Sequence, residues 1–258
     1  MIKILLMGRK TVTAEALRKL CKMSNVVVVG VMTDSHLSGS PTTSVANELG
    51  VKLYSFDEAL FCLKNNTLEF DLGLSILYWR KLREEFLEVP KLGVINFHPA
   101  PLPEYKGTAG YNLAILEARN SWAVSAHYID AEIDTGPIVE VSSFPIDSDR
   151  ETCESLEKKS MLEMAKLIDK VAKLAINSSL KLDSFPNIGG RYISREQMEK
   201  MKQIQSGDDV ARKVRAFWFP PYDGAYMELQ NCRYTLVNQE ILERLAPIGS
   251  TSLFTQGA

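Results

Sequence analysis

The sequence lacks the short motifs that identify several common protein classes. Its four cysteines are far apart and none forms a CxxC pair, which excludes a zinc knuckle and a dithiol redox site. The turn after the first apolar run, MGRKTVTAE, contains a single glycine. It therefore matches neither the GxGxxG dinucleotide fingerprint nor the GxxxxGK(S/T) phosphate loop. We expect Gly8 to form a tight turn and the cysteines to be scattered, buried thiols in a reducing compartment.

Other absences concern partners and location. The net charge of −2 and the pI near 6.0 give no reason to expect a nucleic-acid-binding protein. No apolar run reaches the roughly 18–20 residues that span a bilayer. The segment MIKILLMGRK has no basic leader and no cleavage site. We expect a cytoplasmic protein that binds neither membranes nor nucleic acids.

What the sequence does contain is a regular alternation of apolar runs and helical patterns. The apolar runs of strand length are 2–7, 26–32, 51–54, 70–77 and 92–97. The helical patterns between them are 11–23, 41–49, 57–63 (with Asp57 as its N-cap) and 81–87. This alternation predicts an α/β fold, a Rossmann-like core with a mostly parallel sheet and helices on both faces.

The second half of the chain does not continue the regular alternation of strands and helices. The expected elements are a helix at 108–119, strands at 122–130 and 136–146, and helices at 151–176 and 208–215. After about residue 180 the pattern breaks into short pieces, and FWFPPYDGAYMEL and CRYTLVNQEIL suggest a turn and short strands. We predict two domains: a catalytic core at 1–185 and a small β-rich extension at 186–258.

One stretch, VINFHPAPLPEYKG, combines a strand end with two polar side chains and three prolines. Residues two apart on a strand share a face, so Asn96 and His98 point the same way at the carboxyl end of a parallel strand. That edge is where α/β proteins bind ligands, and the prolines stiffen the loop that follows. A histidine can take the proton of an attacking amine, and an asparagine N–H can stabilise an oxyanion. Asp134, in the turn IDTGP, is the candidate that orients the imidazole. The alternative is that His98 and Asn96 make only local contacts that close the strand.

The other two histidines are predicted to have no catalytic role. His127 lies in a predicted strand, where a half-buried histidine with satisfied hydrogen bonds is expected. His36 lies in the polar loop DSHLSGS and is expected at the surface.

The two motifs together resemble the formyltransferases that use 10-formyltetrahydrofolate. The family pattern Asn-x-His-x-x-x-Leu-Pro is met by NFHPAPLP at 96–103, and a later Asp-x-Gly is met at 134–136. The resemblance extends from residue 1 to about 180. It implies that Asn96, His98 and Asp134 are the catalytic residues and that no metal is needed.

The same resemblance implies where 10-formyltetrahydrofolate binds. SILYWRKL is similar to the family's folate-side stretch, and the segment before Asp134 is similar to its pterin-lining loop. The implied cofactor residues are Ile76, Tyr78, Trp79, Arg80, Leu82, Ile129 and Asp130. The alternative for the Tyr-Trp-Arg triplet is aromatic packing under the start of a helix.

The C-terminal third resembles nucleotide-sugar N-formyltransferases, mainly through RKVRAFWFPPYDGAYMEL. The residues expected to bind the substrate are Lys106, Gly107, Tyr111, Arg191, Arg212, Arg215, Trp218 and Tyr222. Basic side chains suit a diphosphate and aromatic rings suit a stacked base. Helical phase places Arg212 and Arg215 on one side and leaves Lys213 solvated. The alternative for AFWFPPY is a hydrophobic plug that seals the appended domain.

The expected function is formyl transfer to the amine of a dTDP- or GDP-linked 6-deoxy amino sugar, for O-antigen or other surface-polysaccharide synthesis. Two alternatives stay open. One is a methionyl-tRNA or glycinamide ribonucleotide formyltransferase, and the other is a non-catalytic folate or nucleotide-sugar binding protein. Dimers are common among the relatives, so a homodimer is expected. The sequence does not identify the sugar, the carbon that bears its amine, or the nucleotide.

Overall fold

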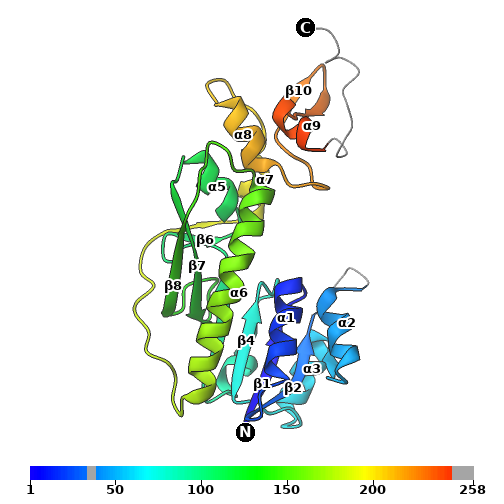
Figure 1. The fold of residues 1–258 in the computed structure, drawn as a ribbon, viewed down its shortest axis with the longest axis vertical. Helices are drawn as coiled ribbons and strands as arrows, with labels where there is room; N and C mark the ends of the chain where they lie inside the picture. Colours follow the sequence, from blue (N-terminus) through cyan, green and yellow to red (C-terminus); the bar gives the residue numbers. More distant parts are fainter. Residues whose placement is uncertain (34–38, 246–258) are drawn as a thin grey trace.

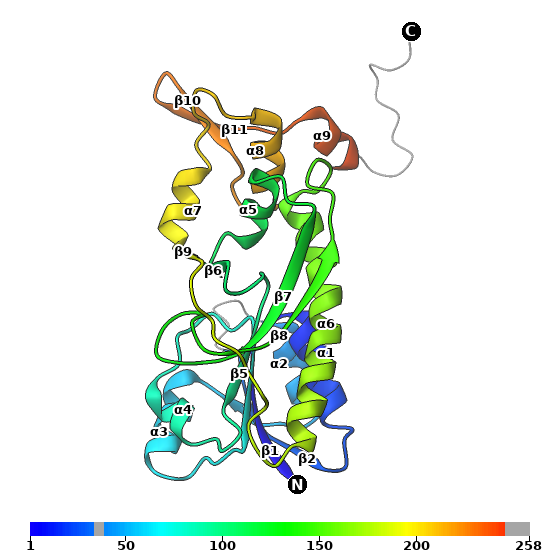
Figure 2. The same ribbon diagram turned by 90° about the vertical axis from the view of Figure 1, so that its left-hand side faces the viewer.

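The computed structural model describes residues 1–33 and 39–245 (Figure 1). The molecule is elongated, and the long helix α6 (Cys153–Asn177) runs beside both the sheet at the N-terminal end and the small elements at the C-terminal end (Figures 1 and 2). His36, predicted to lie at the surface, falls outside the described residues.

A single seven-stranded sheet in the described part of the chain forms the core, in the order β3-β2-β1-β4-β5-β7-β8. Its parallel strands are β1 (Ile2–Met7), β2 (Val26–Met32), β3 (Leu53–Tyr54), β4 (Leu72–Ile76) and β5 (Val94–His98). The last two strands, β7 (Ser121–Tyr128) and β8 (Ile138–Pro145), run antiparallel to their neighbours. The predicted α/β fold with a mostly parallel sheet is confirmed, and the carboxyl ends of its parallel strands share one edge.

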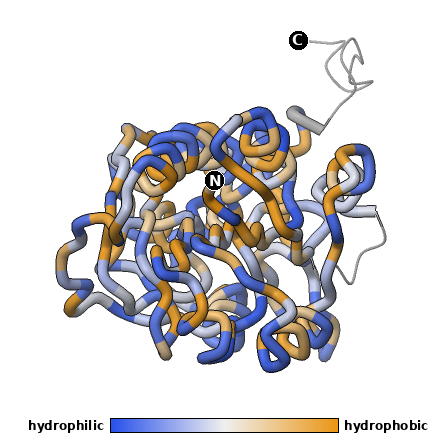
Figure 3. The backbone as a smooth tube through the Cα atoms, turned by 90° about the horizontal axis from the view of Figure 1, so that it is seen from below, coloured by the Kyte–Doolittle hydropathy of each residue, from blue (hydrophilic) through white to orange (hydrophobic). Residues whose placement is uncertain are grey.

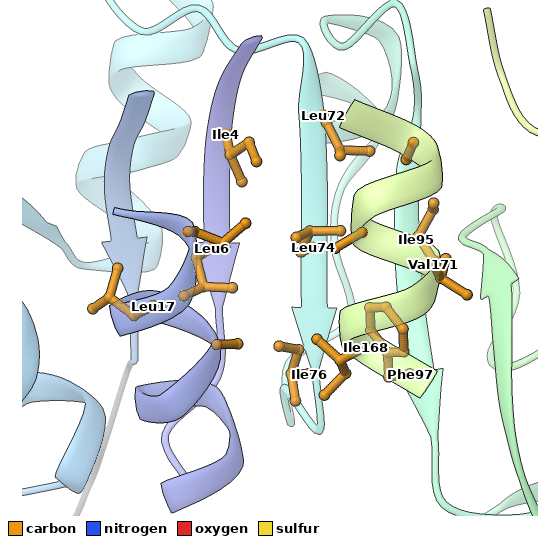
Figure 4. Close-up of a cluster of buried hydrophobic side chains, with 14 of the residues drawn as sticks. Ile4, Leu6, Leu17, Leu72, Leu74, Ile76, Ile95, Phe97, Ile168 and Val171 are labelled. Carbon is orange, nitrogen blue, oxygen red and sulfur yellow. The ribbon is translucent and has the colours of Figure 1, made fainter. Parts of the chain in front are cut away.

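The continuous apolar runs arise because helices cover both faces of the sheet. On one face, α6 lies beside Leu74 of β4 and Ile95 of β5 (Figure 4), and residues of α2 (Pro41–Glu48) join the same cluster. Ile4 and Leu6 of β1 pack beneath α1 (Thr11–Leu20), as Figure 4 also shows. Their neighbours Leu5 and Met7 point to the opposite face. That face is covered by α3 (Phe56–Lys64) and α4 (Glu84–Glu88).

A further apolar cluster joins the C-terminal elements to the core. It contains Trp122 of β7 together with residues of α5 (Gly110–Leu116) and α8 (Val210–Phe217). The remaining elements of this half are β6 (Tyr105–Gly107), β9 (Arg191–Ile193), α7 (Arg195–Met201), β10 (Tyr226–Leu229), β11 (Cys232–Thr235) and α9 (Gln239–Leu245). The parallel pair β6–β9 crosses the predicted boundary at residue 185, and that boundary stays a prediction.

Some local predictions are wrong. Helix α3 is capped by the Ser55 hydroxyl rather than by Asp57, since Ser55 accepts from the backbone N–H of Glu58. Of the four cysteines only Cys153 is buried, because the others lie at a helix end, on a half-open helix face and in an exposed hairpin. The strand predicted for CRYTLVNQEIL is present only at Cys232–Thr235, because the residues from Gln239 onwards form helix α9, which buries Ile241. The short helix α7 is mostly charged and was not predicted.

Hydrophobic and hydrophilic residues alternate over short distances along the backbone (Figure 3). Within residues 1–33 and 39–245, none of the helices has the length and apolar character needed to cross a bilayer.

Candidate active site

A row of polar side chains crosses three neighbouring strands near the carboxyl edge of the sheet. The strand register aligns Ser75 on β4, Asn96 on β5 and His127 on β7. The Ser75 hydroxyl donates to Asn96 Oδ1 at 2.8 Å, and Asn96 Nδ2 donates to His127 Nε2 at 3.1 Å. His127 Nε2 can accept because its Nδ1–H donates to the Tyr128 carbonyl oxygen at 2.7 Å. The Asn96 amide is therefore held on both sides, and His127, only 2% exposed, is not the half-buried histidine that was expected.

Asp134 reaches this row from the loop that follows β7. Its Oδ2 lies 3.4 Å from His98 Nδ1, and its Oδ1 lies 3.4 Å from His127 Nε2 and 3.5 Å from Asn96 Nδ2. The structure thus brings together the three side chains predicted to be catalytic and adds His127 to them.

The loop that carries Asp134 is shaped by its own sequence. Asp134 has a left-handed backbone with φ of 55°, which is uncommon outside glycine. The Asp130 carboxylate folds the loop back by accepting from the Thr135 hydroxyl at 2.6 Å. A Cβ on Gly136 would lie 1.9 Å from the Tyr128 carbonyl oxygen, so only glycine fits where the loop meets β7.

His98 presents one basic nitrogen to Asp134. Its Nε2–H donates to the Tyr105 carbonyl oxygen at 2.9 Å, and a carbonyl can only accept, so Nε2 carries the proton. The neutral ring therefore keeps its lone pair on Nδ1, which faces the Asp134 carboxylate. A proton taken up at Nδ1 would leave an imidazolium between a carbonyl and a carboxylate.

The proline-rich exit from β5 is tied to β7. Trp122 Nε1–H donates to the Pro99 carbonyl oxygen at 3.0 Å. The Ser125 hydroxyl donates to the Ala100 carbonyl oxygen at 2.7 Å and accepts from the Leu102 N–H at 3.0 Å. These contacts fix a stretch whose φ angles the prolines already restrict.

The electrostatics favour a charged Asp134 beside an uncharged His98. Burial alone would raise the pKa of Asp134, but the positive charge that His98 carries in the acid range where this carboxyl titrates, the contact with His127 and the N–H of Gly107 lower it to about 2. Burial lowers the pKa of His98 below its ordinary value, and the Asp134 carboxylate opposes that shift. A neutral base, an amide donor and a carboxylate at one point suit acyl transfer to an amine. Among residues 1–33 and 39–245, no three His, Cys, Asp or Glu side chains are grouped so as to hold a metal ion.

Comparison with known proteins identifies the family. Residues 2–171 match the family described as formyl transferase, and this range covers most of the chain and the whole cluster around Asp134. The chain belongs to the formyl transferase family. It is an enzyme that transfers formyl groups.

Individual relatives of this formyltransferase have different substrates in their names. A methionyl-tRNA formyltransferase of Listeria innocua is 27% identical over 241 residues, covering 89% of this chain and 76% of the relative. The crystal structure of a 4-N formyltransferase from Francisella tularensis has a TM-score of 0.75 at 19% identity, covering 92% of this chain and 97% of that one. An N-formyltransferase from Helicobacter canadensis, solved with folinic acid and dTDP-3-aminofucose, has a TM-score of 0.71 at 21% identity, covering 90% and 85%. At these identities the structures show a shared fold.

A cavity of about 120 Å³ opens beside the Asn96 amide of this formyltransferase. The predicted cofactor residues that line it are Tyr78, Trp79, Arg80, Leu82, Ile129 and Asp130. Ile76 does not line it, because alternation along β4 turns this side chain into the core beside Ile168 (Figure 4). Trp79 is 55% exposed and does not fit the alternative of aromatic packing under a helix, whereas Tyr78 fits it in part, since it packs against the cluster beneath α3 and α4.

Two arginines predicted to bind a diphosphate have partners inside the protein. Arg212 donates to Asp149 at 2.7 Å and to the Ile115 carbonyl oxygen at 3.1 Å, and Arg215 donates to a backbone carbonyl at 3.4 Å. Lys213, expected to be solvated, is buried and pairs with Asp208 at 2.6 Å. Basic side chains of helix α8 therefore bind groups within the protein, although Arg215 Nε is buried without a hydrogen-bond partner, and the diphosphate site there stays a prediction.

Lys106 and Arg191, also predicted to bind the substrate, have partners around the β6–β9 pair, and the Arg191 side chain remains 46% exposed. Lys106 is 8% exposed and its ammonium donates to the carbonyl oxygens of Asn187 and Gly189, and Arg191 is ion-paired with Glu117. Their basic charge alone did not reveal these internal partners.

Tyr111 and Trp218 lie in or near the interior. Burial raises the pKa of Tyr111 well above its ordinary value, and its hydroxyl lies against α6. Trp218 packs partly buried against the same apolar cluster as Phe217, which is 2% exposed. This part of the segment fits the hydrophobic-plug alternative.

Tyr222 lies elsewhere, in a groove of about 720 Å³ at the carboxyl end of β1. Its ring lies 5.8 Å from that of Phe219. Arg9 and Lys10, from the turn before α1, also line the groove, and Lys10 is ion-paired with Glu157 of α6. Arg9 and Lys10 were not among the predicted site residues, because a turn with one glycine matches neither nucleotide-binding motif and the groove forms only when β1 and the C-terminal segment come together.

Acid unfolding tests the charge state of Asp134. Its carboxylate has a pKa of about 2 in the folded protein against an ordinary value of 3.8, so it stabilises the fold above pH 3.8 and this contribution is lost as the pH falls towards 2. The difference corresponds to about 2 kcal/mol. We expect Asp134→Asn to flatten the fall in unfolding free energy between pH 4 and 2 by about this amount, measured by urea denaturation. Asp183→Asn, the same charge change on the exposed segment after α6, should retain the wild-type slope.

Proposed function

We propose that this formyltransferase moves the formyl group of 10-formyltetrahydrofolate to the amine of a dTDP- or GDP-linked 6-deoxy amino sugar. The observation that carries the proposal is the convergence of Asn96, His98 and Asp134 at the edge of a cavity lined by the predicted folate residues. Surface-polysaccharide synthesis, including O-antigen, is the process this activity would serve.

In the proposed reaction the sugar amine attacks the formyl carbon and must lose a proton. His98 Nδ1 accepts it, because Nε2 is already occupied by the Tyr105 carbonyl. The imidazolium that forms is stabilised by Asp134, 3.4 Å away. The carbonyl oxygen becomes an oxyanion, which the Asn96 N–H facing Asp134 at 3.5 Å is placed to receive. Collapse of the tetrahedral intermediate breaks the bond between the formyl carbon and the folate nitrogen, and the proton goes to that nitrogen.

The folate would lie in the cavity beside Asn96. Two of the lining residues, Tyr78 and Ile129, offer an apolar wall beside the Asp130 loop, whose main chain can hydrogen-bond a flat pterin ring. The fold neighbour from Helicobacter canadensis was solved with folinic acid, which supports a folate in this family.

The nucleotide would lie in the groove between Tyr222 and Lys10. Helix α1 has no acidic residue in its first turn and no side-chain cap at Lys10, so its terminal N–H groups favour an anion. A base can stack on the Phe219–Tyr222 pair while a diphosphate meets Lys10. The names of the neighbours from Francisella tularensis and Helicobacter canadensis support an amino sugar as the acceptor.

A second candidate substrate is methionyl-tRNA. The 27% identity to the Listeria innocua enzyme over 89% of this chain favours it, and the catalytic chemistry would be the same. The decisive measurement is formyl transfer from 10-formyltetrahydrofolate to dTDP- and GDP-linked amino sugars, methionyl-tRNA and glycinamide ribonucleotide, compared by kcat/KM. The proposal requires a sugar nucleotide to be the best acceptor. A higher value for tRNA or glycinamide ribonucleotide would replace it, and absence of turnover with all of them would favour a binding protein.

Tyr222→Ala tests the nucleotide groove. We expect KM for the sugar nucleotide to rise about tenfold, because one stacked base is worth about 1–3 kcal/mol, with kcat and the KM for 10-formyltetrahydrofolate within about twofold. Phe61→Ala removes a similarly exposed aromatic ring on α3, away from the groove, and should behave as wild type. An unchanged KM for the sugar nucleotide in Tyr222→Ala would show that its nucleobase does not stack in this groove.

The expected homodimer and cytoplasmic location belong to the same proposal. The hairpin β10–β11 exposes Leu229 and Tyr234, each about half accessible, which supports association through the C-terminal strands. Light scattering on the purified chain tests the dimer directly.

A further inference from the structure

The segment 178–190, here called the strap, connects α6 to β9. It returns from the far end of α6 along the edge of the sheet towards β6 (Figures 1 and 2). Its residues are mostly exposed, and Ile188 is 79% accessible. Within 181–190 the only buried side chain is that of Asn187, at 8%. A single buried amide in an otherwise exposed connection indicates a specific contact.

That contact is with the loop of Asp134. Asn187 Nδ2 donates to the Asp134 carbonyl oxygen at 2.9 Å and to the Gly136 carbonyl oxygen at 2.9 Å. The Asn187 side-chain NH2 therefore donates to the backbone carbonyl groups of the two residues that flank Thr135. Asp134 has a positive φ, a conformation that persists only where neighbouring groups hold it. The amide bridges the two carbonyls and opposes relaxation of this turn.

The strap is itself held in place from three sides. The Lys106 ammonium donates to the carbonyl oxygens of Asn187 and Gly189. The backbone of Phe185 exchanges two 2.9 Å hydrogen bonds with Ile138 of β8. A Cβ on Gly190 would lie 1.6 Å from a backbone carbonyl oxygen of the proline-rich loop, so the strap lies directly against that loop. Asn187 is therefore presented from a fixed backbone.

The strap also reaches His98 through β6. Strand β9 continues from the strap and pairs with β6, whose Tyr105 carbonyl oxygen accepts from His98 and whose Gly107 N–H donates to Asp134 Oδ2 at 2.9 Å. Two hydrogen bonds thus hold Asp134 in place. Gly107 N–H donates to its carboxylate, and the Asn187 amide donates to its backbone carbonyl oxygen.

We propose that Asn187 is a positioning residue that aims the Asp134 carboxylate at His98 Nδ1. The proposal rests on the proposed role of Asp134 in formyl transfer. Without the Asn187 amide the turn relaxes, the carboxylate moves away from the imidazole, and the imidazolium loses its counter-charge. A misplacement of about 1 Å at a reacting group can cost up to about 10²-fold in rate.

Two substitutions test this, each in the full-length chain. Asn187→Leu keeps the branch at Cγ and removes both donors, and Asn187→Ala lets water reach the freed carbonyls. Ile188→Ala, a truncation of the exposed neighbour on the same strap, is the matched control. We expect both Asn187 variants to lower kcat about 10- to 100-fold with both KM values within about twofold, and Asn187→Gln to recover part of the loss because it keeps the donors.

A second readout needs no substrate. The chain has only three histidines, so the imidazole signals of His98 can be followed by NMR across a pH titration. The Asp134 carboxylate raises the pKa of His98, and its withdrawal should move the His98 titration to lower pH in both Asn187 variants but not in Ile188→Ala. A purely structural role would lower the melting temperature and leave this titration in place.

The outcomes are separable. A shifted titration together with a selective loss of kcat supports the proposal. An unmoved titration, unchanged kcat in a folded variant, or failure of both variants to fold overturns it, since the last result would assign Asn187 to the fold as a whole. If the wild-type chain formylates none of the acceptors but the titration shifts as expected, the proposed function fails and the positioning of Asp134 stands.

Discussion

His98→Gln is expected to lower kcat for formyl transfer by about 10²- to 10⁴-fold, the range typical of losing a general base. Glutamine can place an N–H donor near the Tyr105 carbonyl oxygen, as His98 Nε2 does now, but it has no basic nitrogen in place of Nδ1. The fold and the substrate pockets should therefore survive while proton removal fails. The measurement is kcat and KM for both substrates, with circular dichroism to check folding.

The matched control is the other buried imidazole. His127 also contacts Asp134, but its Nε2 accepts from the Asn96 amide and orients that donor. We expect His127→Gln to lose only about tenfold, since it perturbs a donor's direction and leaves the base intact. Equal losses in the two variants, or turnover above one tenth of wild type in His98→Gln, would contradict the assignment of the base.

The sequence predicted the local parts of this site well. Asn96 and His98 share a face because strand period is a local rule, and the valine and leucine runs reveal the strands because helices bury both faces. The stiffness of the proline-rich loop after β5 could also be predicted, since proline restricts φ wherever it occurs. Asp134 was reached only through its glycine-proline turn and the family resemblance.

The non-local parts were not predictable in the same way. His127 and Ser75 join Asn96 through the register of β4, β5 and β7, and no pattern within one strand encodes which strand lies next to it. Arg212 and Lys213 illustrate the same limit. Arg212 was predicted to bind phosphate and Lys213 to be solvated, because their partners across the fold, Asp149 and Asp208, cannot be recognised from the local sequence. Asn187 gave no signal at all, because its contacts are to backbone atoms far away in sequence.

Asp134→Asn is expected to lower kcat by about 10²- to 10³-fold and to move the acid limb of its pH profile to lower pH. In the wild type the carboxylate raises the pKa of His98 against the effect of burial. Asparagine removes that charge, and its N–H can donate to Nδ1, which ties up the lone pair that must accept the proton. Both effects weaken the base, so His98 loses its proton at a lower pH and the remaining activity persists further into the acid range.

The direction of that displacement is the sharpest discriminator between roles for Asp134. If Asp134 itself removed the proton, the acid limb of the wild type would follow its own pKa of about 2, and Asp134→Asn would abolish the limb instead of moving it. If Asp134 only maintained the loop, kcat would change little, because asparagine can still accept from the Gly107 N–H. Asp183→Asn controls for the loss of one negative charge and should leave both kcat and the profile as in the wild type. A limb that moves to higher pH would reverse the sign of the interaction and exclude Asp134 as the group that stabilises the imidazolium.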